Sequence, residues 1–188
     1  MARGLRILLA SSSPRRIELL GQLGLDFTHV APNVEEDESS LDPVERVEGN
    51  ARRKAMSVSA PDSVVIGSDT VVELDGQILG KPSNEEEAKI MLASLSGHVH
   101  HVYSGLSLVF KGKSVTRHTC TKVWFRTLSD KEIDDYVESG EPLDKAGSYG
   151  IQGSDRVLVE KIEGSYSNVV GLPLELLEEM LLEFGIRP

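Results

Sequence analysis

The sequence predicts an α/β fold in which helices flank a mixed central sheet. Short apolar runs typical of strands alternate along the chain with segments whose apolar residues recur at helical spacing. Tight turns at 75–76 and 111–113 join neighbouring strands, which indicates antiparallel pairs beside the parallel ones. No internal repeat, low-complexity stretch or linker interrupts this order, so we expect one folding unit.

Composition excludes several classes of protein. Of the 188 residues 39% are hydrophobic and 27% charged, as in ordinary globular enzymes. The formal net charge of −10 argues against a protein that coats nucleic acid. A single cysteine, Cys120, cannot form an internal disulfide or a cysteine-based zinc cage. With no signal peptide and no apolar run near the ~18–20 residues of a membrane helix, we expect a cytoplasmic protein with no membrane partner.

Cap residues mark the helix starts in the first part of the chain. Ser13 precedes Pro14, and Asp42 precedes Pro43, with an acidic residue at the third position of the second helix. Lys54 falls at the edge of the apolar stripe of that second helix. The predicted elements are a strand at 6–10, a helix from 14 ending at Gly24, an acidic loop at 30–40 and a helix from 43 to 58.

The remaining elements follow the same signals. Ser83 with Glu86, and Ser129 with Glu132, have the spacing of capping boxes. Asp75-Gly76 is a strong hairpin signal. The predicted elements are strands at 64–74, 77–79, 98–110, 114–125 and 156–162, helices from 83 to 95 and from 129 to near Gly140, a glycine-rich loop at 141–153, and a final helix that begins after Pro173 and runs through Phe184.

Serines and arginines gather where the first strand meets the first helix. Backbone N–H groups, hydroxyls, guanidinium groups and the positive end of the helix dipole together form an anion site suited to phosphate. The alternative is an ordinary capped amphipathic helix with two solvated arginines. The residues concerned are Ser11, Ser12, Ser13, Arg15 and Arg16.

Further charged residues follow strands or line a helix. Asp69 follows an apolar run, where a carboxylate is costly unless it is paired, metal-bound or in a hydrated cleft; the alternative is a turn aspartate. Lys81 is either a phosphate ligand or a solvated turn residue. Lys54 is either a functional lysine or one that merely snorkels at the edge of its helix, as most helix-edge lysines do. The acidic cluster at 35–38 is either a solvated loop or a source of carboxylates for a divalent metal beside nucleotide phosphates.

Six segments in order resemble the blocks of the Maf family of nucleotide pyrophosphatases. The resemblance covers nearly the whole chain, and the order of the blocks makes it specific. Two positions depart from the family pattern: Ser68 stands where alanine is expected, and the run 52–55 carries an arginine where glutamate is expected. The matching segments are 9–16, 67–72, 80–82, 95–97, 144–153 and 168–173.

The resemblance implies hydrolysis of a nucleoside triphosphate between its α and β phosphates, with a divalent metal (Mg²⁺, Mn²⁺ or Co²⁺). It also implies one Maf-like domain over 1–188, with an ITPase-like mixed sheet and an active-site cleft between two lobes, in a homodimer. Asp69 becomes the general base, and Glu36 a second catalytic carboxylate; both become metal ligands. The implied substrate-binding residues are Ser11, Ser13, Arg15, Arg16, Lys54, Thr70, Lys81 and Gln152.

The segment 149–153 resembles the branch that acts on dTTP and UTP, with CTP or modified pyrimidine nucleotides as further substrates. Arg15, Thr70 and Gln152 are then the expected specificity positions, in a role of house-cleaning or nucleotide-pool control. Two alternatives stay open at this point. One is a non-catalytic nucleotide- or DNA-binding regulator of cell division, which would not need Asp69. The other is a purine-directed house-cleaning pyrophosphatase.

Overall fold

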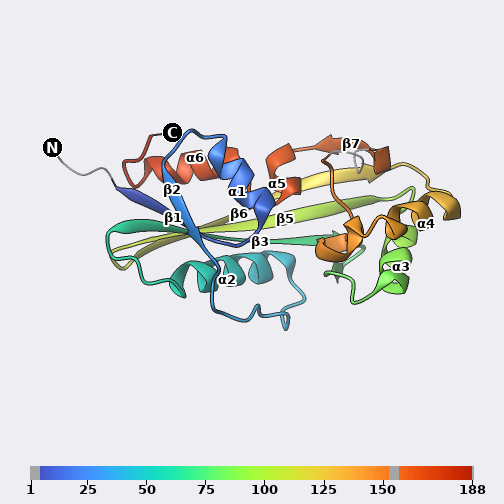
Figure 1. Ribbon diagram of the computed structural model, residues 1–188, viewed down its shortest axis with the longest axis horizontal. Coiled ribbons are helices and arrows are strands. Elements are labelled where there is room, and N and C mark those ends of the chain that lie inside the picture. Colours follow the sequence, from blue (N-terminus) through green and yellow to red (C-terminus); the bar gives the residue numbers. More distant parts are fainter. Residues whose placement is uncertain (1–4, 153–156, 188) are drawn as a thin grey trace.

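The computed structural model describes residues 5–152 and 157–187, and within these residues it contains one seven-stranded sheet (Figure 1). The strand order is β2-β1-β3-β5-β6-β7, with the short β4 paired to β3. The strands are β1 (Arg6–Ala10), β2 (Phe27–Val30), β3 (Ser63–Leu74), β4 (Gln77–Leu79), β5 (Val99–Phe110), β6 (Lys113–Phe125) and β7 (Val159–Glu163).

The sheet is mixed, which confirms the predicted fold class. β1 is parallel to both of its neighbours, β2 and β3, whereas the pairs β3–β5, β5–β6 and β6–β7 are antiparallel. The hairpin between β3 and β4 turns through Asp75 and Gly76, which have φ values of 50° and 82°. These left-handed conformations match the twist of the flanking strands and suit an aspartate–glycine pair.

Helices cover both faces of the sheet (Figure 1). α2 lies on one face, α1 and α6 lie on the other, and α3 and α4 pack together toward one end of the molecule. Glycines on β3 and β5 allow the α2 backbone to touch the sheet directly. The α-helices are α1 (Pro14–Gly21), α2 (Pro43–Met56), α3 (Glu85–Leu95), α4 (Asp130–Glu138), α5 (Tyr166–Val170) and α6 (Leu174–Leu182).

The helix caps are mostly as predicted, with one wrong assignment. The Asp42 side chain accepts hydrogen bonds from two backbone N–H groups of α2, and Ser129 forms the predicted capping box with Glu132. α3, however, is capped by Asn84, whose side chain accepts from the backbone N–H of Glu87, and not by Ser83 with Glu86. Asn84 adopts the extended backbone of an N-cap, which moves the helix start one residue along the chain.

Two short elements were not predicted. β2 has four mostly exposed residues at the edge of the sheet, and α5 has only five residues, so neither carries a clear periodic pattern. The predicted loop at 141–153 contains two 3₁₀ turns, at Glu141–Asp144 and Ala146–Ser148. The last strand begins at Val159; the predicted positions Gly153 and Arg156 lie outside the described residues.

The main core lies between the sheet and the α1, α3 and α6 helices. Leu9, Ile66 and Leu106 of the sheet are fully buried there, together with Leu92 of α3 and Leu177 of α6. A smaller apolar cluster lies on the opposite side, where Ala55 of α2 packs against β1 and β3. Among the described residues, no helix combines the length and the apolar character needed to cross a membrane.

Candidate active site

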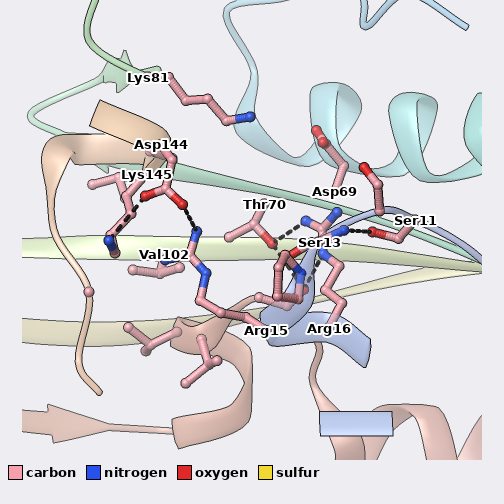
Figure 2. A pocket seen from close by; sticks show the side chains of 18 of the residues that line it. Ser11, Ser13, Arg15, Arg16, Asp69, Thr70, Lys81, Val102, Asp144 and Lys145 are labelled. Atoms are coloured by element: carbon pink, nitrogen blue, oxygen red, sulfur yellow. Dashed lines mark hydrogen bonds and ion pairs between the residues drawn. The ribbon is translucent and has the colours of Figure 1, made fainter. Parts of the chain in front are cut away.

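A cavity of about 690 Å³ brings together every residue assigned to a site from the sequence. Figure 2 labels part of this set, including Asp69, Arg16 and Lys81. Its walls come from the β1–α1 turn, the loop before α2, α2 itself, β3, the segment after β4 and the loop that follows α4. The predicted residues among those that line it are Ser11, Ser13, Arg15, Arg16, Glu36, Lys54, Asp69, Thr70, Lys81 and Gln152.

Asp69 is a buried carboxylate in the middle of β3, with 5% of its surface exposed. The strand continues on both sides of it and pairs Asp69 with Gly105 of β5, so the interpretation as a turn aspartate is wrong. Its Oδ1 atom accepts a hydrogen bond from Lys54 Nζ at 2.6 Å. Lys54 is itself buried, so the two opposite charges pair with each other away from solvent.

Lys54 joins Asp69 to a second carboxylate, Glu36. Lys54 Nζ lies 2.6 Å from Glu36 Oε1 as well as 2.6 Å from Asp69 Oδ1. Burial by itself would raise the pKa of Glu36, but Lys54, with smaller contributions from Lys81 and Arg16, holds that pKa below its usual value. Lys54 is therefore a buried, paired lysine between two carboxylates, and the snorkelling alternative is wrong.

Asn50, one helical turn before Lys54, also reaches this cluster. Its Nδ2 donates to Asp69 Oδ2 at 3.2 Å and to the Asp37 carbonyl oxygen at 3.2 Å, and its Oδ1 accepts from the Asp37 backbone N–H at 2.7 Å. Asn50 was not among the site residues predicted from the sequence. The sequence feature that could have identified Asn50 is its spacing of four residues from Lys54, which places both side chains on one face of α2.

Arg16 forms the opposite wall of the cavity. Its Nε donates to the Gly171 carbonyl oxygen at 2.8 Å, and its Nη2 donates to Thr70 Oγ1 at 3.1 Å. Burial lowers the pKa of Arg16, although the nearby carboxylates of Asp69 and Glu36 favour its charged form. Thr70 Oγ1 also lies 2.8 Å from Ser104 Oγ, so the arginine is fixed by neutral groups on β3 and β5.

The β1–α1 turn presents serines to the cavity. Ser13 occupies the N-cap position of α1, as predicted, but its side chain makes no capping hydrogen bond. The backbone N–H of Ser13 instead donates to Ser11 Oγ at 3.1 Å. Because the first backbone N–H groups of a helix have no partner within the helix, this turn can offer donors to an anion in the cavity.

Arg15, Asp144 and Lys145 form a chain of charges on another side of the cavity (Figure 2). Arg15 Nη2 lies 3.9 Å from Asp144 Oδ2, and Lys145 Nζ donates to Asp144 Oδ1 at 3.0 Å and to Glu141 Oε2 at 2.9 Å. Lys145 was not among the predicted site residues. Its burial follows from the fold of the 3₁₀ turns, which no local pattern predicts.

An aromatic pair backs the cavity near Gln152. Tyr149 lines the cavity, and its hydroxyl lies 2.6 Å from Nε2 of the buried His100. Burial raises the pKa of Tyr149 well above its usual value. Gln152 follows three residues later and is half-buried at the cavity wall.

The described residues contain no cluster of three histidine, cysteine, aspartate or glutamate side chains that could hold a metal ion by themselves. Glu36 and Asp69 nevertheless direct one oxygen each at the same Lys54 ammonium, so both lie within reach of one cation. Mg²⁺ beside nucleotides is commonly held by one or two carboxylates together with substrate phosphates. This donor set fits a metal that binds with a phosphorylated substrate.

Both positions that depart from the family pattern have partners. Ser68 Oγ donates to the Gly171 carbonyl oxygen at 3.2 Å, and Gly171 also accepts from Arg16. Arg53 Nη2 lies 2.7 Å from Asp37 Oδ2 and so attaches the acidic loop to α2. The departures therefore add contacts around the carboxylate cluster.

Comparison with known proteins places the chain in a family. Residues 6–184 match the family described as Maf-like protein. A dTTP/UTP pyrophosphatase of Dictyoglomus turgidum is 50% identical over 185 residues, which cover 95% of this chain and 96% of that protein. A dTTP/UTP pyrophosphatase of Vibrio parahaemolyticus is 47% identical over 188 residues, which cover 98% of this chain and 100% of that protein.

A solved structure, that of the Staphylococcus aureus Ham1 protein, overlaps with a TM-score of 0.45 at 16% identity, over 64% of this chain and 71% of that one. The match to the family spans nearly all of the described strands and helices and the whole of the cavity wall. The chain therefore belongs to the Maf-like protein family.

Proposed function

We propose that this protein hydrolyses dTTP and UTP between the α and β phosphates, to give the nucleoside monophosphate and pyrophosphate. The observation that carries the proposal is one cavity in which two carboxylates face several cationic side chains. The names of the relatives, which match over nearly their whole length, support the same reaction and the same substrates. CTP and modified pyrimidine nucleotides are further candidate substrates.

The basic side chains suit a triphosphate. Among the described residues, neither Arg16 nor Lys81 has a carboxylate within ion-pair distance, so their charges are available to phosphate oxygens. Arg15 has only a long ion pair, 3.9 Å, with Asp144. Together with the N–H groups and hydroxyls of the β1–α1 turn, these residues would stabilise the pyrophosphate as it leaves.

Asp69 is suited to act as the general base. In the proposed step it accepts a proton from water while the water oxygen bonds to the α-phosphorus and the bond to the bridging α–β oxygen breaks. A carboxylate has about four lone-pair sites, so Lys54 and Asn50 leave acceptor capacity for that water. Lys54 donates a hydrogen bond to Asp69. Arg16 lines the same cavity (Figure 2).

We assign the divalent metal, Mg²⁺, Mn²⁺ or Co²⁺, to Glu36 and Asp69, with the substrate phosphates completing its coordination. When bound, such an ion neutralises phosphate charge and lowers the pKa of water. Lys54 would then keep the two carboxylates close together without supplying a ligand itself.

We assign base recognition to Gln152, with Arg15 and Thr70, which line the same cavity, as the further specificity positions. A glutamine side chain carries both a donor and an acceptor, so it can pair with the N3–H and carbonyl edge of thymine or uracil. Gln152 lines the same cavity as the two carboxylates, from the loop that follows α4. The homodimer and the cytoplasmic location expected from the sequence stay predictions.

The decisive test is pyrophosphate release from dTTP, UTP, CTP, GTP and ITP with Mg²⁺ or Mn²⁺, for the natural protein and for Asp69→Asn. We expect the pyrimidine nucleotides to be preferred and the Asp69→Asn variant to lose ~10²-fold or more in turnover. Binding of nucleotides without pyrophosphate release would favour the non-catalytic regulator. Faster release from GTP or ITP would favour the purine-directed enzyme.

A further inference from the structure

We propose that Asn50 is a positioning residue that holds both carboxylates of the site in their working arrangement. The inference rests on the proposed function and deepens it, because it names a residue outside the cavity wall that sets the geometry of Asp69 and Glu36. Asn50 itself is 2% exposed and would not touch the substrate.

Asn50 makes hydrogen bonds to both segments that hold the carboxylates, namely β3 and the acidic loop before α2. One amide hydrogen goes to Asp69 Oδ2 on β3, at 3.2 Å. The other contacts bind the backbone of Asp37 in both directions, N–H to Oδ1 at 2.7 Å and Nδ2 to the carbonyl at 3.2 Å. Asp37 directly follows Glu36, so one side chain joins the strand that carries Asp69 to the loop that carries Glu36.

The position of Asn50 is itself fixed by the packing of α2. The helix lies against β3 and β5 at Gly67 and Gly105, where no side chain keeps the backbones apart. Lys54, one turn further along the same helix, binds the other oxygen of Asp69. Both oxygens of Asp69 are therefore held from α2, one by a charged donor and one by a neutral donor.

Lys54 alone does not fix this arrangement. An ammonium group attracts both carboxylates but has little directional preference, because its three hydrogens rotate freely. The planar amide of Asn50 binds Asp37 through a donor and an acceptor at once, and so determines where the acidic loop meets the helix. We infer that Asn50 supplies the orientation and Lys54 the charge.

The first experiment is a double-mutant cycle on pyrophosphate release from dTTP, with Asn50→Leu and Asp69→Asn alone and combined. If Asn50 acts through Asp69, Asn50→Leu reduces kcat by about 10–100-fold in the natural protein, the usual effect of a residue that supports a metal ligand or catalytic group. In the Asp69→Asn background the same change has a much smaller further effect, because only the contribution through Glu36 remains. An equal loss in both backgrounds would mean a general structural role and would overturn the proposal.

A binding measurement provides a readout that does not depend on turnover. Electron paramagnetic resonance of Mn²⁺ with a non-hydrolysable α,β-methylene analogue of dTTP reports metal binding at the site. We expect about 10-fold or more weaker Mn²⁺ binding for Asn50→Leu, because Asp69 and Glu36 no longer converge. Unchanged Mn²⁺ affinity with the analogue bound would contradict the inference.

Asn84→Leu is the matched control. It removes a side-chain hydrogen bond to a helix backbone at the start of α3, outside the cavity. We expect a lower Tm but unchanged kcat and Mn²⁺ affinity. If Asn50→Leu does not fold, Asn50→Asp replaces it, since it keeps the volume and an acceptor for the Asp37 N–H.

For Asn50→Asp the loss should be smaller in the Asp69→Asn background, because the new amide can donate to the new carboxylate while the hydrogen bond to the Asp37 carbonyl oxygen stays lost. A loss that persists unchanged in that combination would overturn the proposal. A natural protein that releases no pyrophosphate from any nucleotide would instead contradict the proposed function itself, and the inference with it.

Discussion

Gly67 of β3 lies directly against the backbone of Ala51 in α2. A Cβ atom added to Gly67 would lie 2.1 Å from the Ala51 carbonyl oxygen and 2.7 Å from the backbone nitrogen of Ala55. Both neighbours are backbone atoms, which cannot rotate away as a side chain can. This contact sets the distance between α2 and the sheet. The same distance allows Asn50 and Lys54 to form their hydrogen bonds with Asp69.

Gly67→Ala should therefore damage both stability and activity. We expect a loss of about 1–3 kcal/mol in the free energy of unfolding, since the added methyl group forces helix and sheet apart. Turnover should fall as well, because Lys54 moves away from Asp69. Urea denaturation and pyrophosphate release measure the two effects.

Gly49→Ala is the control within the same helix. A Cβ atom added to Gly49 would meet nothing within 4 Å beyond its chain neighbours and the backbone of its own helix, so the substitution should raise stability by about 0.5–1 kcal/mol through the unfolded state. A Gly67→Ala variant as stable and active as Gly49→Ala would show that the close approach does not position the site.

Lys81→Ala should weaken turnover of every triphosphate by a similar factor. Lys81 extends into the cavity from the segment after β4, and among the described residues no carboxylate pairs with it (Figure 2). Loss of a charge-assisted hydrogen bond to phosphate corresponds to about 10–100-fold in kcat/KM. Steady-state kinetics on dTTP, UTP and GTP over a range of salt concentrations would measure it.

The half-buried Lys89, which pairs with Asp134 outside the cavity, supplies the control. Lys89→Ala should leave kcat/KM unchanged for all three nucleotides. Losses at Lys81 that depend strongly on the base would mean that this lysine does not bind the triphosphate.

Gln152→Ala should reduce the preference for dTTP and UTP over GTP and ITP. The basal hydrolysis that depends on Asp69 should continue with all four nucleotides. A site that hydrogen-bonds a base discriminates against one with mismatched donors, and an alanine removes that discrimination. The ratio of pyrimidine to purine kcat/KM is the quantity to measure, with the exposed Gln77→Ala as control. An unchanged ratio would remove Gln152 from base recognition.

His100 should make the stability of the protein depend on pH below neutrality. Burial, with a smaller contribution from His101, lowers the pKa of His100 to about 3. Its Nε2 pairs with the Tyr149 hydroxyl, and its buried Nδ1 has no partner among the described residues. An unfolded histidine has a pKa of about 6.5, so between that pH and about 3 the unfolded chain binds a proton that the folded chain does not.

Stability contributed by neutral His100 is therefore complete above a pH of about 6.5 and is lost as the pH falls, with a slope that approaches about 1.4 kcal/mol per pH unit. His100→Gln removes this slope, whereas His98→Gln, at an exposed position, leaves it in place. Urea denaturation at pH 7, 6 and 5 compares the three proteins. Parallel curves for the natural protein and His100→Gln would contradict the assignment.

Local signals predicted most of the fold. Strand periodicity, the Asp75-Gly76 turn and cap residues such as Asp42 act over a few residues, so they can be recognised without the tertiary structure. β2 was missed because it is short and exposed and is defined by its pairing with β1. At the start of α3 two cap residues stand side by side, and the choice of Asn84 over Ser83 depends on backbone conformation.

Candidate site residues could be chosen from the sequence where a charged side chain follows an apolar run, as at Asp69, or lies at the start of a helix, as at Arg16. Asn50 and Lys145 were not found, because asparagine and lysine are common on helices and loops. Their roles arise from contacts with other segments, Asp69 for Asn50 and the 3₁₀ turn at Glu141 for Lys145. The spacing of four residues between Asn50 and Lys54 places both side chains on one face of α2, but no local pattern shows which segment those side chains contact.

The position of bond cleavage tests the central claim most directly. Hydrolysis of dTTP in ¹⁸O-labelled water, with Mg²⁺, can be followed by mass spectrometry of both products. Attack on the α-phosphorus, with Asp69 as base, predicts that dTMP carries one ¹⁸O atom and that pyrophosphate carries none. Label in pyrophosphate, or formation of dTDP and phosphate, would contradict the account.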